Sequence, residues 1–145
     1  MRVGIKSGCW TLFHKGHVWC LQQCAKQCDY LIVLTNEDPY IMSKKGNVPI
    51  PMEDRIYILN HIVGVDEVGH FPEPTEDRWV RDFVANRLHE FGSDAKLVVF
   101  HSDELKERHE NGHRVPGQGV ADEIIFIDKV AKPESVSRIY NEIRR

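Results

Sequence analysis

The chain has 145 residues, of which 41% are hydrophobic and 28% charged, and its formal net charge is −3. This length suits one domain with its own core, so we expect a single domain over residues 1–145. The longest apolar run, 31–34, is too short to span a bilayer, no signal-peptide pattern opens the chain, and an acidic balance is atypical of nucleic-acid-binding modules. We therefore expect a cytoplasmic protein that binds neither membranes nor nucleic acid.

Five short segments rich in Val, Ile, Leu and Phe are predicted strands. Two of them, 30–35 and 96–100, are nearly continuous in apolar residues, which is typical of strands buried on both faces of a parallel sheet. In chain order the predicted strands are Arg2–Lys6, Tyr30–Thr35, Glu67–Phe71, Lys96–Phe100 and Glu123–Ile127.

Amphipathic segments alternate with these strands. The segments 15–28, 51–63 and 75–91 carry apolar residues three and four positions apart, and a last helix opens near Ser135. This alternation predicts a Rossmann-like α/β fold, an open five-stranded parallel sheet with helices on both faces. Ligands of such sheets bind at the carboxyl ends of the strands, where the strand order reverses.

The segment 7–17 follows the first predicted strand and opens the first helix. It contains His14 and His17, with Gly16 between them. Unpaired N–H groups at a helix N-terminus attract phosphate; Gly8 allows a close turn of the backbone, and Gly16 lets phosphate approach the helix. Imidazole N–H groups there can donate to phosphate oxygens and stabilise the charge that grows on a leaving pyrophosphate. The pattern predicts a site for a nucleoside triphosphate.

The run His14-Lys15-Gly16-His17 resembles the His-x-Gly-His signature of the nucleotidyltransferase superfamily, which includes cytidylyltransferases and several adenylyltransferases. Further along, the chain is similar to glycerol-3-phosphate cytidylyltransferases and heptose-1-phosphate adenylyltransferases, and the run Phe71–Thr75 favours the heptose type. The resemblance covers most of residues 1–77 and 130–145, and its other shared elements are Asn36–Asp38, Lys45–Gly46, Pro49, Arg55, Val65–Val68 and Ser135–Ser137.

The resemblance implies a role for each matching residue. His14 and His17 would hold the triphosphate and stabilise the transition state. Lys44 or Lys45, expected on a loop after the second strand, and Arg55, expected in the first turn of its helix, would bind phosphate. The remaining expected nucleotide contacts are Gly8, Cys9, Trp10, Thr11 and Gly16 near the first helix, and Lys132, Ser135, Val136 and Ser137 near the last.

The implied reaction is the transfer of CMP or AMP from CTP or ATP to a small phosphorylated alcohol or sugar phosphate, with release of pyrophosphate. The phosphate oxygen of the acceptor attacks the α-phosphorus directly, so positioning and charge stabilisation suffice. Mg²⁺ is the implied cofactor, bridging triphosphate oxygens, and the resemblance implies a homodimer. The alternative is a non-enzymatic nucleotide-binding module of the same fold. The choice between CTP and ATP, and the identity of the acceptor, stay open.

Three positions depart from the family's pattern. Trp10-Thr11 stands where Phe-Asp is usual, and Val136 stands where a threonine is usual. The run Phe100–Asp103 replaces a basic or glycine-rich element after the fourth strand. Because that region helps to build the nucleotide site, this departure bears on which base and which acceptor are bound.

Three further patterns have structural interpretations. The run 109–113 matches the zinc-protease pattern His-Glu-x-x-His, but Gly112 interrupts the helix which that pattern needs, so we interpret 103–112 as a short helix and predict no metal site. The cysteines Cys20, Cys24 and Cys28 recur at every fourth position; we expect free thiols that pack on the sheet rather than a soft-metal site. Residues 112–119, rich in glycine, are predicted to form a mobile surface loop.

Overall fold

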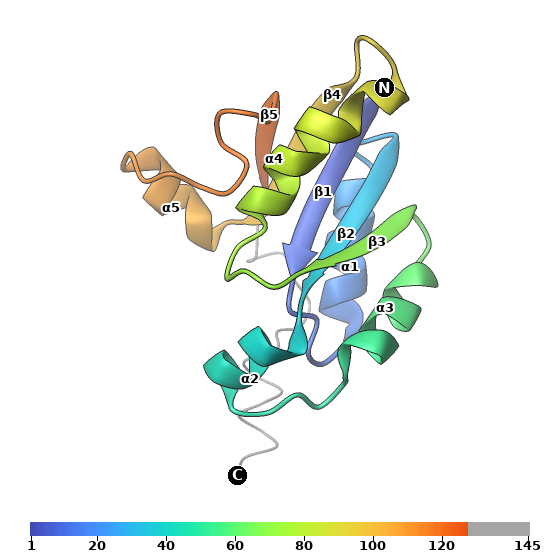
Figure 1. Ribbon diagram of the computed structural model, residues 1–145, viewed down its shortest axis with the longest axis vertical. Helices are drawn as coiled ribbons and strands as arrows, with labels where there is room; N and C mark the ends of the chain where they lie inside the picture. Colours follow the sequence, from blue (N-terminus) through green and yellow to red (C-terminus); the bar gives the residue numbers. More distant parts are fainter. Residues whose placement is uncertain (128–145) are drawn as a thin grey trace.

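The computed structural model describes residues 1–127 as one parallel sheet with flanking helices. Strands and helices alternate along the chain (Figure 1). The strands are β1 (Arg2–Gly8), β2 (Tyr30–Asn36), β3 (Glu67–Phe71), β4 (Lys96–Ser102) and β5 (Glu123–Ile127); the helices are α1 (Lys15–Ala25), α2 (Asp38–Lys45), α3 (Met52–Asn60), α4 (Asp77–Asn86), the 3-10 turn η1 (Leu88–Phe91) and α5 (Glu104–Glu110).

The sheet has the order β3-β2-β1-β4-β5, and every adjacent pair is parallel. The chain steps outward from β1 through β2 to β3, returns to β4 on the other side of β1, and then continues to β5. The strand order therefore reverses between β1 and β4, so the carboxyl ends of these two strands border the crevice in which open α/β sheets bind ligands. The predicted Rossmann-like fold is confirmed.

Two hydrophobic cores cover the two faces of this sheet, as expected when side chains alternate along buried strands. One core joins α1 and α3 to the sheet through Leu21 and Leu59, and it contains Val98 and Phe100 of β4. The other joins α4 through Val80 and Phe83, and it contains Leu97 and Val99 of β4. Helices thus pack on both faces and hold the carboxyl ends of the central strands in place.

The helices differ from the predicted ones mainly at their ends. Helix α1 stops at Ala25 rather than at residue 28, α3 is shorter than the predicted 51–63, and the predicted 75–91 helix is divided into α4 and η1. Helix α2 was missed, although Pro39 stands in its first turn and Gly46 ends it in the left-handed conformation, with φ +80°. Both are recognised signals for helix ends.

The cysteine stripe on α1 packs against the sheet, as predicted. Cys20 and Cys24 are buried in the core beneath α1, and Cys28, just past the end of the helix, is half-buried against that core. All four cysteines are free thiols. Burial raises the pKa of the Cys28 thiol to about 11, so this sulfur stays protonated at neutral pH and behaves as a small apolar group.

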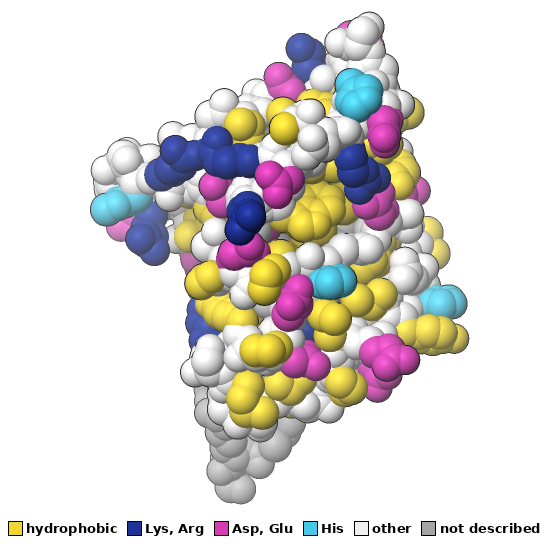
Figure 2. Space-filling view, viewed as in Figure 1, with side chains coloured by type: hydrophobic (Ala, Val, Ile, Leu, Met, Phe, Trp, Pro, Cys, Tyr) yellow, Lys and Arg dark blue, Asp and Glu magenta, His cyan; other side chains and the backbone are white. Residues whose placement is uncertain are grey.

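On the face shown in Figure 2, basic and hydrophobic side chains gather over different helices. Lys and Arg side chains form a band over α4 and toward α5, whereas hydrophobic side chains gather over α2. On α2 the side chain of Met42 is 52% exposed. No helix within residues 1–127 is long and apolar enough to cross a membrane.

One ion pair ties the edge strand β3 to the end of α4. Glu67 accepts hydrogen bonds from both terminal nitrogens of Arg87, at 2.9 and 2.7 Å, and one from the Tyr30 hydroxyl at 3.0 Å. The hydrogen bonds from Arg87 hold the pKa of Glu67 below its ordinary value, although burial opposes this. A carboxylate with a lowered pKa in the folded state stabilises the fold above its unfolded pKa.

We expect Glu67→Gln to lower the free energy of unfolding by about 1 kcal/mol at pH 7, a modest effect because Arg87 remains 38% exposed. The stabilisation by Glu67 is lost as pH falls through its lowered pKa, so the difference between wild type and variant should narrow below about pH 4.5. Urea denaturation across pH 3.5–7.5 measures this, with Glu90→Gln as control because Glu90 lies 3.9 Å from Arg87 and is 57% exposed. An equal effect of both variants, or a gap independent of pH, would contradict the prediction.

Candidate functional site

The candidate site lies at the carboxyl end of β1, where the chain turns into α1. Strand β1 ends at Gly8 and α1 begins at Lys15, with His14 as its N-cap. The first turn of α1 contains no acidic side chain, so no local carboxylate neutralises the positive end of its dipole. Position and polarity both suit an anionic ligand, as the sequence predicts.

The two motif histidines cap this helix reciprocally. The Gly16 N–H donates to Nδ1 of His14 at 3.0 Å, and the His14 N–H donates to Nδ1 of His17 at 3.3 Å. Their rings stack, with centroids 4.0 Å apart and planes 26° apart. The two rings therefore form one rigid unit at the N-terminus of α1.

These bonds fix which nitrogen of each ring carries hydrogen. Because the backbone N–H groups donate, each Nδ1 must accept, and a neutral ring then carries its hydrogen on Nε2. Each Nε2 is left as the donor of its ring. A pair of oriented N–H donors beside a helix N-terminus is the arrangement needed to stabilise charge growing on phosphate oxygens.

An aromatic cluster supports His17 from beneath. Trp10 and Phe13 meet the ring of His17 edge to face, at 5.3 and 5.5 Å, and the Trp10 Nε1–H donates to the Leu34 carbonyl at 2.9 Å. A Cβ on Gly8 would lie 2.9 Å from the indole ring, so glycine at this position makes room for Trp10. Glycine at position 8 therefore accommodates the indole, and its predicted contact with nucleotide stays a prediction.

This packing changes the interpretation of two predicted nucleotide contacts. Trp10 is 5% exposed and Thr11 is 1% exposed, so their side chains lie under the motif instead of lining an open surface. Trp10 also adopts a positive φ of 53°, which is rare for a bulky residue and marks a constrained turn. The turn is held in this shape by the buried indole. Cys9 is half-buried, and its thiol lies 3.4 Å from Oδ1 of Asn36.

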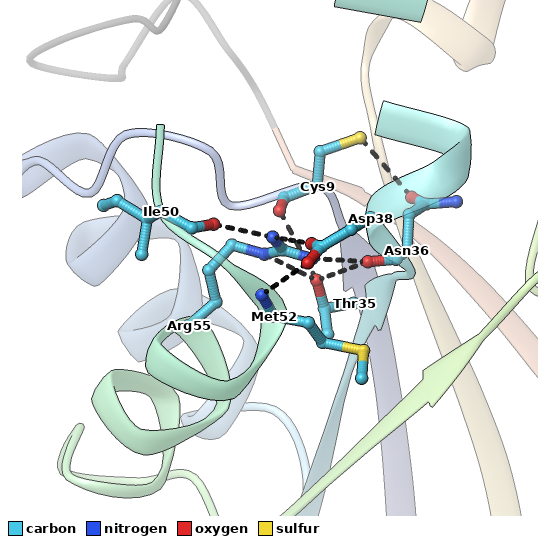
Figure 3. A network of polar contacts seen from close by, with 7 residues as sticks. All are labelled: Cys9, Thr35, Asn36, Asp38, Ile50, Met52 and Arg55. Atoms are coloured by element: carbon cyan, nitrogen blue, oxygen red, sulfur yellow. Dashed lines mark hydrogen bonds and ion pairs between the residues drawn. The ribbon is translucent and has the colours of Figure 1, made fainter. Parts of the chain in front are cut away.

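Arg55 is the largest correction to the predicted site. Its side chain is fully buried and donates to four protein oxygens (Figure 3). Nε contacts the hydroxyl of Thr35 at 3.3 Å, and one terminal nitrogen contacts the Asn36 carbonyl at 2.6 Å. The other terminal nitrogen contacts Asp38 at 2.7 Å and the Ile50 carbonyl at 2.8 Å. A guanidinium with no exposed surface does not fit direct binding of phosphate, so Arg55 is a positioning residue.

The Arg55 network holds the chain that follows β2. Asp38, the first residue of α2, bonds both Arg55 and the backbone N–H of Met52, the first residue of α3, at 3.2 Å (Figure 3). These two hydrogen bonds therefore hold the first residues of α2 and α3 close together. Lys44 and Lys45 lie in the last turn of α2, not on a loop as the sequence suggested.

The positive charges of these lysines act on the start of the histidine motif. Burial raises the pKa of the Cys9 thiol, and Lys45, Lys44 and Arg55 oppose that rise in this order. Nζ of Lys44 lies 5.8 Å from the centroid of the Tyr40 ring on the same helix. The two lysines remain candidates for contact with phosphate.

Four predicted nucleotide contacts, Lys132, Ser135, Val136 and Ser137, lie outside the described residues. Gly16 is buried within α1, and its predicted contact with phosphate stays a prediction. In the departing run Phe100–Asp103, the structure places His101 in a buried position at the carboxyl end of β4, 3.6 Å from Glu76. No local pattern in the sequence indicates that pair, because its members are 25 residues apart.

The pattern at 109–113 does not form the helix of a zinc protease. Helix α5 ends at Glu110, and Gly112 has φ +88°, so His109 and His113 do not share a helix face. Within residues 1–127, no group of three His, Cys, Asp or Glu side chains is arranged to hold a metal ion. The predicted short helix at this position is confirmed.

Residues 5–115 match the protein family described as cytidylyltransferase-like. The chain belongs to this family. The match runs from β1 through the histidine motif and α5, and membership identifies this part of the chain as a nucleotidyltransferase domain.

Two relatives illustrate the similarity in sequence. The bifunctional protein HldE of Gluconacetobacter diazotrophicus is 39% identical over 83 residues, which are 56% of this chain and 17% of that protein. HldE of Photorhabdus laumondii is 32% identical over 106 residues, which are 72% of this chain and 22% of that protein. The chain thus spans about a fifth of the length of the curated relatives it matches.

Solved structures share the fold at lower identity. A lipopolysaccharide core biosynthesis protein from Thermoplasma volcanium aligns with a TM-score of 0.61 and 19% identity, covering 88% of this chain and 95% of that one. A NadR protein in complex with NAD and AMP-PNP aligns with a TM-score of 0.56 and 20% identity, covering 99% of this chain and 41% of that one. At these identities the likeness supports the fold alone.

Proposed function

We propose that the chain transfers the nucleoside monophosphate group of ATP or CTP to a small sugar phosphate or phosphorylated alcohol, with release of pyrophosphate. The observation that carries this proposal is the reciprocal capping of His14 and His17. It fixes two imidazole rings at the N-terminus of the helix that follows β1, and the strand order reverses between β1 and β4.

In this proposal the triphosphate binds at the N-terminus of α1. The acceptor phosphate attacks the α-phosphorus, the bond from that phosphorus to the bridging oxygen breaks, and the electron pair leaves with pyrophosphate. Each Nε2–H donates to an oxygen on which negative charge grows, and Lys44 and Lys45 neutralise phosphate from the side of α2. The histidine rings are already fixed by their Nδ1 bonds, so little reorganisation accompanies the reaction.

Magnesium enters this scheme as part of the substrate. Mg²⁺ in nucleotide sites keeps several waters and is bound mainly by phosphate oxygens with one or two carboxylates. The described residues include no three-ligand cluster, which fits an ion that arrives with the triphosphate rather than one held by a protein cage.

ATP is the favoured donor and a sugar phosphate the favoured acceptor. Two observations support this choice: the Phe71–Thr75 run of the heptose type, and the HldE proteins among the relatives. The buried His101 stands where the family usually has a basic or glycine-rich element, so base selection in this chain needs its own measurement.

A thermal-shift comparison of Mg-ATP and Mg-CTP tests the donor. A nucleotide at 100 times its dissociation constant should stabilise the fold by about 2.7 kcal/mol and raise Tm by several degrees. We expect the larger shift with ATP, and the same shift with GTP or UTP would argue against a base-selective site.

Pyrophosphate release then identifies the acceptor. The preferred nucleotide is supplied with a panel of hexose and heptose 1-phosphates, glycerol 3-phosphate, phosphocholine and phosphoethanolamine. Release that depends on one acceptor class supports the proposal. Tight nucleotide binding without release for any phosphomonoester would instead support a binding module that lacks turnover.

A further inference from the structure

A buried acid–imidazole pair lies near the candidate site without belonging to it. Glu76, just before α4, is 6% exposed, and His101, near the end of β4, is 4% exposed. Oε1 of Glu76 and Nδ1 of His101 are 3.6 Å apart. Ionisable side chains are rarely buried unless their partners compensate for the lost hydration, so this pair needs a structural or functional explanation.

The other ring nitrogen of His101 contacts the chain between α5 and β5. Its Nε2 lies 2.8 Å from the Pro116 carbonyl, and a carbonyl only accepts, so Nε2 carries a hydrogen and Nδ1 faces Glu76. Burial lowers the pKa of His101, while the Glu76 carboxylate and the Pro116 carbonyl act to raise it. His101 is thereby a bridge between the start of α4 and residues 113–119, here called the strap.

The strap is also held from α4. The Gly117 N–H donates to Asp77, the first residue of α4, at 2.8 Å, and Arg81 donates to the Gln118 carbonyl at 3.0 Å. Burial would raise the pKa of Asp77, but the Gly117 and Arg81 hydrogen bonds outweigh it and lower that pKa. The sequence predicted a mobile loop here; the structure shows a segment tied by side chains that the sequence places far away.

Gly117 allows the strap to lie flat on the sheet. It has φ +83°, and a Cβ there would come within 3.0 Å of Val99 on β4. Val99 and His101 are two residues apart on one strand, so both project from the same face, the one covered by α4. The strap thus crosses this face of β4 just before the strand ends. The band of Lys and Arg side chains in Figure 2 runs over the same region, between α4 and α5.

This position borders the crevice of the sheet. Phe100 pairs with Lys6, so the next residues of each strand bring His101 alongside Ser7, at one strand spacing of about 5 Å, and β1 ends one residue later at Gly8. Strand order reverses between these two strands.

We infer that His101 is a positioning residue that, with Glu76 and the Pro116 carbonyl, holds the strap as a wall of the nucleotide site. This inference rests on the proposed function, because it takes the β1–β4 edge as the place where the nucleotide binds. It assigns a role to the departing run Phe100–Asp103: the imidazole of His101 recruits the strap to the carboxyl end of β4.

The rate of trypsin cleavage after Arg114 measures how readily the strap opens. Arg114 is exposed, whereas Val115 is 2% exposed and its N–H is bonded to the Gln118 side chain, so cleavage between them requires the strap to open. Mass spectrometry separates this product from cleavage after Arg108 in α5. The rate needs no nucleotide and no activity.

Four variants make the test specific. His101→Leu removes the donor to Pro116, His101→Gln can keep a donor near the place of Nε2, and Asp77→Asn weakens the second tie through Gly117. His89→Leu, an exposed histidine on η1, is the matched control. ATP and CTP dissociation constants are measured by calorimetry, and kcat and KM by pyrophosphate release.

We expect His101→Leu to speed cleavage after Arg114 about tenfold and to weaken nucleotide binding by a similar factor, with KM raised and kcat changed less. Asp77→Asn should act in the same direction, His101→Gln should recover part of both effects, and His89→Leu should change neither. A merely structural role would leave the nucleotide dissociation constant of the folded variants unchanged.

Three results would overturn the inference. Unchanged cleavage in both His101→Leu and Asp77→Asn would show that these contacts do not hold the strap. Faster cleavage with an unchanged dissociation constant would show that the strap is no wall of the nucleotide site, while the proposed function stands. If the wild-type protein binds neither nucleotide, the proposed function is wrong, and the inferred role of the strap as a wall of the nucleotide site is wrong with it. This outcome differs from the other two because it is observed in the wild-type protein and not only in a variant.

Discussion

Replacing His14 or His17 by asparagine should lower kcat by about 10²- to 10³-fold while leaving the fold intact. Asparagine is a good N-cap residue, and its side-chain oxygen can accept the backbone N–H that each Nδ1 accepts now. It has no counterpart to Nε2–H. These variants therefore separate the capping role of the motif from its role toward the phosphates.

Kinetics and thermal unfolding of the same preparations test this separation. His14→Ala should lose the cap as well, lowering the free energy of unfolding by about 1 kcal/mol more than His14→Asn does. His61→Asn replaces the exposed histidine just after α3; it serves as the matched control and should keep full activity. If both asparagine variants retained wild-type kcat, the histidine pair would be a helix cap without a part in catalysis.

Replacing Arg55 by methionine should destabilise the protein by about 3 kcal/mol, the largest effect on stability expected for a charged side chain in residues 1–127. The change removes four hydrogen bonds, including those to the carbonyls of Asn36 and Ile50 and to the carboxylate of Asp38. Arg55→Lys should recover little of this loss, because a single ammonium cannot reach oxygens arranged around a planar guanidinium.

Chemical denaturation of Arg55→Met, Arg55→Lys and the control Glu53→Gln measures the difference. Glu53 lies in the same first turn of α3 but is exposed, so its change should fall within about 0.5 kcal/mol of wild type. A stable Arg55→Lys protein with a raised KM for nucleotide or acceptor would instead support the direct contact with phosphate that the sequence suggested.

For Arg55, the sequence predicted the helix position but neither the burial of the side chain nor its partners. The sequence places Arg55 in the first turn of a helix, and the structure confirms this position. Its partners come from β2, from α2 and from the segment before α3, and no local pattern states that these meet. The sequence does not distinguish a buried arginine from an exposed one, so only the structure shows that Arg55 is buried.

Helix α2 is a different kind of omission, because the signals were present. Pro39 in the first turn, Lys44 and Lys45 in the last turn and Gly46 beyond it all indicate a short helix. The segment has a weak apolar pattern, with Ile41 as its buried residue, so apolar periodicity does not indicate a helix here. The structure moves the two lysines from a predicted loop to the last turn of α2.

The sequence by itself determined the class of fold and the position of the histidine motif between the first strand and the first helix. Apolar strands and amphipathic helices are local, periodic features, and the His14–His17 pair needs only the strand, turn and helix that surround it. The tertiary structure decided which distant residues meet: Glu76 with His101, the strap with α4, and Arg55 with Thr35. Those contacts depend on the order of strands in the sheet and on burial, and both are properties of the packed chain as a whole.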